Sequence, residues 1–224
     1  MNRYEQFDTE LRLCRKCEAT LAKYFVDPPN SNAAVQPSPI VSGIRPKQIL
    51  LLGQAPGLKE YETGKPFQGQ AGQKIRNIFS DVGISDFDSL VYSSAVVKCY
   101  PGRKLRNKDQ PTAGSEDRVP PATMVKHCRP FLERQIELVD PEFIVTLGKF
   151  PLEAYLRLTD RSSSGATLYQ YVGTKEDWGS RLVIFFPHTS GGSRWLNSAE
   201  NKHRFTQAQE LLRDALIKRG ITRV

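Results

Sequence analysis

Apolar runs and amphipathic stretches alternate along most of the chain. Four short apolar runs have the composition of buried strands, at residues 48–53, 90–97, 143–148 and 181–186. Apolar residues at helical spacing predict helices at 4–24, 71–82, 122–139 and 198–218. Pro130 predicts a kink or a boundary in the third helix, and Gly220 ends the last one. Stretches rich in Pro and polar residues predict long loops at 27–46 and 101–121.

This order of elements predicts an α/β fold. Parallel strands joined by helices form a sheet that is covered on both faces. We therefore expect one domain over residues 1–224, a three-layer α/β/α sandwich with a central, mainly parallel four-stranded sheet. In such folds ligands bind beyond the carboxyl ends of the strands. Motifs that directly follow the predicted strands are thus the first candidates for a site.

The net charge of the chain is only weak evidence about its binding partners. Lys and Arg number 32 against 24 Asp and Glu, a formal charge of +8. A basic surface favours polyanions because each neutralised phosphate releases counterions, yet many basic proteins bind no nucleic acid. No apolar stretch is long enough to span a membrane, and the first residues lack the apolar core of a signal peptide. We expect a cytoplasmic protein with no membrane partner.

The chain has four cysteines, Cys14, Cys17, Cys99 and Cys128. Disulfides are rare in the cytosol, so a set of this kind indicates a metal site or redox chemistry. Four thiolates suit an iron–sulfur cluster and structural zinc equally well. The cysteine pattern by itself leaves the two metals open.

Two motifs carry candidate chemistry. The segment 53–57, continued through 64–72, leads from a strand through a glycine-rich loop into a helix, so its backbone amides can approach a ligand closely. An ordinary strand–loop–helix turn has the same appearance. His188 follows the fourth strand in a Gly- and Ser-rich loop, where a histidine is as often structural as catalytic.

Taken together, these motifs resemble the uracil-DNA glycosylase superfamily, and most closely its iron–sulfur branch, families four and five. The resemblance runs from Cys14 to about Asn197. The first family motif is similar to residues 53–57 with their continuation to Gly72, and the four cysteines match the family's cluster ligands. Residues 128–136 and 141–148 resemble the helix and strand that follow in the family.

The resemblance implies a DNA glycosylase that flips a base out of DNA and hydrolyses its N-glycosidic bond. It implies that Phe67 stacks on the base, that His188 and backbone amides of residues 53–57 stabilise the leaving base, and that Gln54 positions the water. The remaining base-pocket residues are Gly53, Ala55, Pro56, Gly57 and Ala95. The cofactor implied is a [4Fe–4S] cluster held by the four cysteines, the partner is DNA, and a monomer is expected.

Further residues are expected to contact DNA. They lie in a basic loop and in the loop around His188: Arg103, Lys104, Arg106, Lys108, Ser190, Ser193 and Arg194. The basic loop belongs to the 28 residues between Cys99 and Cys128, a longer spacing than is usual in family four. A solvated insertion without a role is the alternative interpretation of that loop.

Departures from the family pattern bear on the substrate. Gln54 stands where family four has Glu, Ala95 where many members have Asn, and Gln70 where family five has Asp. Thr189 replaces the usual Pro, and Gly192 occupies the place of a wedge residue, so Trp195 or Leu196 is expected to fill the space of the flipped base. Candidate acids, chosen only by proximity in the sequence, are Glu60, Glu62 and Asp88.

These departures leave several functions open. Release of uracil or another deaminated base is the principal hypothesis. A loss of polar groups that read the base weakens discrimination, so an alternative is a glycosylase for a bulky modified pyrimidine, such as hypermodified cytosine of phage DNA, in antiviral defence. A non-catalytic DNA-binding member of the fold, or a covalent one, is the third possibility.

Overall fold

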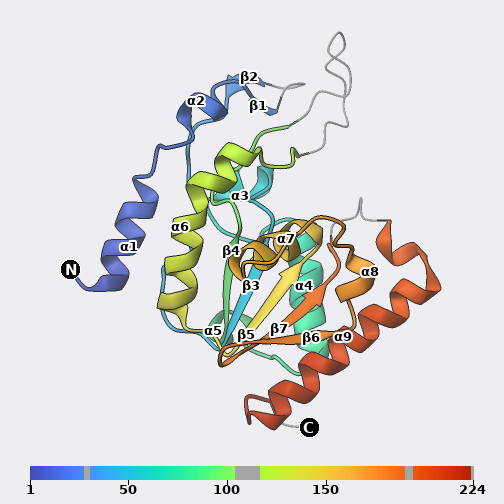
Figure 1. The fold of residues 1–224 in the computed structure, drawn as a ribbon. Helices are drawn as coiled ribbons and strands as arrows, with labels where there is room; N and C mark the ends of the chain where they lie inside the picture. Colours follow the sequence, from blue (N-terminus) through green and yellow to red (C-terminus); the bar gives the residue numbers. More distant parts are fainter. Residues whose placement is uncertain (28–30, 104–116, 190–193, 223–224) are drawn as a thin grey trace.

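The computed structural model describes residues 1–27, 31–103, 117–189 and 194–222 (Figure 1). Its strands are β1 (Phe25–Asp27), β2 (Ser31–Ala34), β3 (Ile49–Gly53), β4 (Val91–Ala95), β5 (Phe143–Leu147), β6 (Lys175–Trp178) and β7 (Arg181–Phe186). Its helices are α1 (Arg3–Arg12), α2 (Glu18–Leu21), α3 (Leu58–Thr63), α4 (Gln70–Asp81), α5 (Phe87–Leu90), α6 (Ala122–Val139), α7 (Lys149–Leu158), α8 (Leu168–Tyr171) and α9 (Ala199–Lys218), with a 3-10 turn, η1, at Trp195–Asn197.

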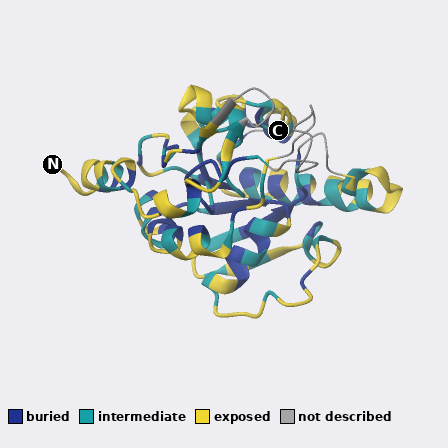
Figure 2. Cartoon of the chain, turned by 90° about the horizontal axis from the view of Figure 1, so that it is seen from above, coloured by how far each residue is buried: buried dark blue, intermediate teal, exposed yellow. Residues whose placement is uncertain are grey.

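A central sheet has the strand order β4-β3-β5-β7-β6, and β1 and β2 form a separate two-stranded sheet. The pairs β4–β3, β3–β5 and β5–β7 are parallel. Side chains of a strand point alternately to opposite faces, so Leu50 and Leu52 pack with α1, α6 and α7, while Ile49 and Leu51 pack with α4, α5 and α9. Figure 2 shows the buried strands between helices whose outer surfaces are exposed. The three-layer α/β/α arrangement and the mainly parallel sheet are confirmed.

The predicted number of strands was wrong, because the central sheet has five. The additional strand, β6, runs antiparallel to β7 at the edge of the sheet and joins it through a tight turn at Gly179, where φ is +62°. Its sequence, Lys-Glu-Asp-Trp, alternates between exposed and half-buried positions. An edge strand of this kind carries no apolar run, so the hydrophobic pattern did not indicate it.

One helix prediction needs correction, and one of the two alternatives at Pro130 is excluded. The helix expected over 4–24 is broken, since α1 ends at Arg12 and α2 starts only at Glu18. In the break the Arg15 guanidinium donates hydrogen bonds to the carbonyl oxygens of Arg12 and Cys14, so it satisfies carbonyls that an unbroken helix would have used. In α6 no boundary occurs at Pro130, and the helix continues through it to Val139.

The predicted loops are partly structured. The segment 27–46 contains β2, and Arg103 of the segment 101–121 forms isolated antiparallel bridges with Phe25 and Asp117. Helix α7, which begins directly after β5, was not predicted. Within the described residues, none of the helices combines the length and the apolar character that a membrane crossing demands.

Candidate active site and cysteine cluster

A pocket of about 840 Å³ opens at the carboxyl ends of β3, β4, β5 and β7. It brings together most of the residues predicted for the reaction: Gly53, Gln54, Ala55, Pro56, Gly57, Phe67, Ala95, Arg103 and His188. This is the edge at which a parallel sheet binds ligands. Residues from well-separated stretches of the chain thus line one pocket.

Phe67 is held by its two glycine neighbours. Its ring lies against Gly53, where an added Cβ would come within 3.3 Å of the Phe67 Cζ atom. Its backbone takes the left-handed conformation, with φ +53°, which is unfavourable for a bulky residue. An added Cβ at Gly72 would lie 2.0 Å from the Phe67 carbonyl oxygen. The sequence therefore fixes this aromatic ring on the wall of the pocket at a cost in backbone strain.

His188 follows β7 and faces Gly148, the residue after β5. The φ of Gly148 is +92°, and an added Cβ there would lie 3.1 Å from the His188 Cβ atom, so glycine allows the two segments to approach. Burial lowers the pKa of His188 below its usual value of 6.5. The next residue, Thr189, donates a hydrogen bond from its hydroxyl to the Ala71 carbonyl oxygen (3.2 Å), which ties the histidine segment to α4.

Gln54 lies at the point where β3 and β4 diverge. Its carbonyl oxygen accepts a hydrogen bond from Val97 N–H (3.1 Å), and the Gly53 carbonyl oxygen accepts one from Val96 N–H (2.9 Å). These bonds fix the first motif against the segment that carries Ala95. Among the described residues the Gln54 side chain makes no hydrogen bond, so its amide is available to a ligand.

Two carboxylates enclose Gly57. The Glu60 carboxylate accepts hydrogen bonds from the backbone N–H groups of Gly57 (3.0 Å), Gln68 (2.8 Å) and Gly69 (2.9 Å). An added Cβ at Gly57 would lie 2.9 Å from Glu60 and 2.8 Å from Asp117. Glu60 therefore joins the two loops of the glycine-rich motif, and its oxygens are used for that purpose.

Asp117 is a carboxylate of the pocket that the sequence patterns did not single out. Its side chain forms an ion pair with Arg103 (3.3 Å) and accepts hydrogen bonds from the Tyr100 hydroxyl (3.4 Å) and the Leu58 N–H. Burial raises its pKa above the usual value and outweighs the effect of Arg103. Its only sequence signal was a position at the end of a long loop, and no motif spacing connects it with Gly57.

The other candidate acids do not line the pocket. Glu62 is exposed and pairs with Lys59, and Asp88 pairs with Arg76 on the other side of Phe67. Trp195 packs on the core between β7 and α9, and neither Trp195 nor Leu196 is among the described residues of the pocket.

The predicted DNA contacts are described only in part. Arg103 lines the pocket, and Arg194 is exposed in front of η1. The other five, Lys104, Arg106, Lys108, Ser190 and Ser193, lie outside the described residues.

The four cysteines lie near one another, although they come from three separate segments of the chain. All four are free, and Cys17, Cys99 and Cys128 are buried. Burial, and after it the negative charge of Cys128 and Cys14, raises the pKa of Cys17 to about 11, and similar causes raise the pKa of Cys99. Thiols that are this costly to ionise together become thiolates readily only when a cation binds them.

The donor set therefore fits a cation that prefers sulfur ligands. In the part of the chain that the structure describes, no three Cys, His, Asp or Glu side chains already stand at metal-ligand spacing. The sulfur atoms would have to approach one another to hold a cluster. His127 also contacts this group, with its Nδ1 atom 3.6 Å from the Cys17 sulfur.

A buried lysine connects the cysteines with the pocket. The Lys98 ammonium donates hydrogen bonds to the Ser94 hydroxyl (2.9 Å), to the Gln135 side-chain oxygen (2.6 Å) and to the Ala95 carbonyl oxygen. Burial lowers the pKa of Lys98 to about 7, while the charge of Cys128 opposes this change. Ser94 and Ala95 line the pocket. The hydrogen bonds from Lys98 therefore hold this part of the pocket wall in place from the buried side.

The family model described as the uracil DNA glycosylase superfamily matches residues 43–223. The type-4 uracil-DNA glycosylase of Archaeoglobus fulgidus is 28% identical over 176 residues, 78% of this chain and 75% of that protein. The type-4 uracil-DNA glycosylase of Pyrobaculum aerophilum is 33% identical over 113 residues, 50% of either chain. That of Thermotoga maritima is 31% identical over 144 residues, 64% of this chain and 65% of that protein.

Proposed function

The chain belongs to the uracil DNA glycosylase superfamily and is a DNA N-glycosylase, and we propose that it releases uracil or another deaminated base from DNA. The type-4 relatives support this substrate class by their names. The observation that carries the proposal is the convergence of Phe67, His188 and the loop 53–57 around one pocket. An aromatic ring, a hydrogen-bond donor and a backbone loop are the groups that base extrusion and bond cleavage require.

Phe67 stacks on the flipped base, and its fixed backbone keeps the ring ready before the base enters. As the glycosidic bond breaks, the base becomes an anion and the sugar becomes an oxocarbenium-like cation. His188 donates a hydrogen bond to the base, and because burial lowers its pKa it does so as the neutral imidazole. A donor of this kind contributes about a hundredfold or more in rate.

Gln54 positions the water that attacks the sugar, since its side chain lies in the pocket. An amide can orient water without removing its proton, which suffices for an electrophile as reactive as an oxocarbenium ion, and the proton that the water loses on bonding to the sugar neutralises the departing base anion. Glu60 and Asp117 act as positioning residues. They hold the loop 53–57 from both sides of Gly57, so the backbone amides of this loop are pre-organised.

Cys14, Cys17, Cys99 and Cys128 hold a [4Fe–4S] cluster in this proposal, as the type-4 names and the donor set suggest. The cluster would supply a cross-link between the segment after α1, the segment after β4 and helix α6. Hydrolysis transfers no electrons, so the reaction itself needs no redox step.

A second substrate class has one structural observation in its favour. Ala95 replaces a residue expected to read the base edge, and it lines a pocket of about 840 Å³, the size range of pockets that take drug-sized ligands. This space would accept a bulky modified pyrimidine such as glucosylated hydroxymethylcytosine. Antiviral defence would then be the role of the enzyme.

The test is a base-release assay on matched duplexes that contain uracil, hypoxanthine, xanthine or glucosylated hydroxymethylcytosine, with alkaline cleavage of the abasic product. Release of deaminated bases, reduced about a hundredfold or more in His188→Ala with DNA binding retained, supports the proposal. Release of the glucosylated base alone supports the second class. Binding without release of any base contradicts both, and a covalent adduct would identify a covalent DNA binder.

A further inference from the structure

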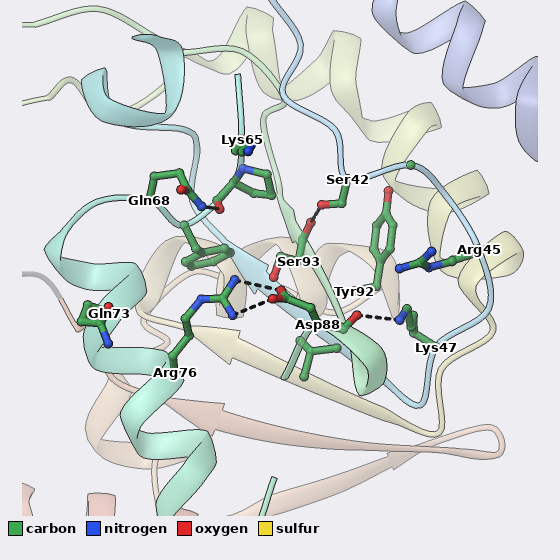
Figure 3. A pocket seen from close by; sticks show the side chains of 14 residues that line it. Ser42, Arg45, Lys47, Lys65, Gln68, Gln73, Arg76, Asp88, Tyr92 and Ser93 are labelled. Atoms are coloured by element: carbon green, nitrogen blue, oxygen red, sulfur yellow. Dashed lines mark hydrogen bonds and ion pairs between the residues drawn. The ribbon is translucent and has the colours of Figure 1, made fainter. Parts of the chain in front are cut away.

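A second hollow of about 540 Å³ lies on the other side of Phe67. It follows the outer edge of β4, between the segment 42–47 and helix α4 (Figure 3). The hollow and the base pocket have Pro66 and Phe67 in common. A group bound in this hollow, which we call the β4 groove, would therefore lie next to the flipped base.

The groove is strongly basic. Four cationic side chains line it, Arg45, Lys47, Lys65 and Arg76, against one carboxylate, Asp88. Its other side chains are mostly hydroxyl and amide groups, which can donate hydrogen bonds to an anion. In Figure 3 Lys65 lies at one end and Lys47 near Asp88 at the other, with Arg45 on the opposite wall from Arg76. Such a lining fits an anionic ligand that spans a good part of the groove.

Two of the four cations are already engaged. Arg76 forms a bidentate ion pair with Asp88 (2.8 and 3.1 Å) and lies over the Phe87 ring at 4.4 Å. Lys47 donates to the carbonyl oxygens of Asp88 (2.6 Å) and Ser89. These contacts hold Arg76 and Lys47 in place at the floor of the groove. They also neutralise Asp88, the one carboxylate among its described lining residues.

Unlike Arg76 and Lys47, the other two cations, Arg45 and Lys65, are not engaged in such contacts within the part of the chain that the structure describes. Both are exposed, and neither side chain has a hydrogen bond or an ion pair among the described residues. Burial, and after it the charge of Arg45, lowers the pKa of Lys47, so positive charges here repel one another. An anion beside Arg45 would relieve its repulsion with Lys47, and Lys65 offers that anion a second donor.

We propose that the β4 groove binds a phosphodiester group of the DNA strand that carries the flipped nucleotide, with Arg45 and Lys65 as its contacts. The inference rests on the proposed function and adds a phosphate site to it. The strand that delivers a base to Phe67 has its phosphates close to that base, so it supplies an anion beside the shared wall. Contacts of this kind fix the register of the strand and carry no sequence information.

The first test is the salt dependence of duplex binding by Arg45→Gln/Lys65→Gln. Loss of one neutralised phosphate should reduce the magnitude of the slope of log affinity against log salt by about 0.9. The matched control is Lys175→Gln/Lys218→Gln, which removes the same charge from β6 at the opposite sheet edge and from the end of α9. A slope equal to that of the control would overturn the proposal.

The second test locates the contact. Single neutral methylphosphonate linkages are placed on either side of the uracil, and binding is measured for the unaltered protein and the double variant. We expect one linkage to weaken binding by the unaltered protein about tenfold and to have no further effect in the variant. If every linkage has the same effect in both proteins, the groove does not bind this strand.

A third experiment distinguishes a DNA phosphate from an acidic protein as the ligand of the β4 groove. Polyglutamate is used as competitor, and loss of polyglutamate binding in the variant with an unchanged DNA slope would indicate an acidic protein partner and contradict the proposal. All these measurements are of binding. A protein that releases no base but shows the expected slopes would disprove the proposed function and leave the phosphate site in place.

Discussion

The Phe67 carbonyl oxygen lies 2.0 Å from the position that a Cβ at Gly72 would occupy. Phe67 itself has a positive φ and places its ring on the wall of the base pocket. The start of α4 and Phe67 are therefore packed so closely that position 72 accepts only glycine. A small change at the start of helix α4 should therefore shift Phe67 in the pocket.

Gly72→Ala should displace Phe67. We expect a loss of stability of about 1–3 kcal/mol, as for an overpacked site, and at least a tenfold fall in base release, measured by urea unfolding and by single-turnover assays. Gly69→Ala is the control, because its Cβ would lie 3.6 Å from Glu60, an ordinary contact. Equal behaviour of the two variants would contradict the packing argument.

His188 should make stability depend on pH. Burial lowers its folded-state pKa below the usual 6.5, so the unfolded chain binds the proton more readily. Its contribution is complete above pH 6.5 and is lost as the pH falls through 6.5 towards the folded-state pKa. His188→Gln should remove this part of the acid dependence in urea unfolding between pH 5 and 7.5. His203→Gln, on the exposed side of α9, provides the comparison, and an identical pH profile in His188→Gln and the unaltered protein would refute the prediction.

Lys98→Met should destabilise the fold. The substitution removes the donor that the Ser94 hydroxyl, the Gln135 side-chain oxygen and the Ala95 carbonyl share. Ser94 still donates to Gln135 (2.6 Å), so the Ala95 carbonyl oxygen is the acceptor that loses most. A buried acceptor without a partner costs about 1–3 kcal/mol, and we expect a loss in this range by denaturant unfolding. Lys126→Met removes an exposed lysine of α6 and should have little effect. Retention of full stability in Lys98→Met would show that the lysine is not an anchor.

Cys128→Ser should lose the metal. Cys128 lies in α6, buried among the other cysteines, and a serine hydroxyl is a poor substitute for a thiolate. We expect bound iron, measured by elemental analysis of anaerobically purified protein, to fall together with the visible absorbance and the unfolding temperature. Zinc without iron in the unaltered protein would argue against the cluster.

The hydrophobic pattern was sufficient for those parts of the fold that are buried on both sides. β3 and β5 are buried at every position, and their continuous apolar runs were predicted within a residue of their bounds. β6 is half exposed and charged, so nothing in its pattern distinguished it from a loop. The pattern of apolar residues indicates which segments are buried. It does not indicate an edge strand such as β6, which is stabilised mainly by hydrogen bonds to the neighbouring strand.

The candidate site divides in the same way. Phe67 was predicted from the resemblance to the family and His188 from its place directly after a strand as well, and both line the pocket. Asp117 could not be predicted, because its position beside Gly57 results from a backbone bridge with Arg103 and from side-chain contacts with Arg103 and Tyr100. Glu60 was named as a candidate acid, but only the structure shows that its oxygens bind backbone N–H groups.

Glu60→Gln tests whether Glu60 positions the loops or acts as a base. One carboxylate oxygen accepts from Gln68 and Gly69 and the other from Gly57. An amide has only one such oxygen, and its NH2 group would face a backbone N–H. We expect a loss of about 1–3 kcal/mol in stability and a slower release of the base at all pH values.

The pH profile of base release separates the two roles. A positioning residue lowers the rate without changing the shape of the profile, whereas loss of a general base removes the acid limb. Glu62→Gln, which alters an exposed carboxylate paired with Lys59, should leave rate and stability nearly unchanged. A profile that loses its acid limb in Glu60→Gln would show that Glu60 takes the proton of the attacking water, and the role of Gln54 would then have to be given to Glu60.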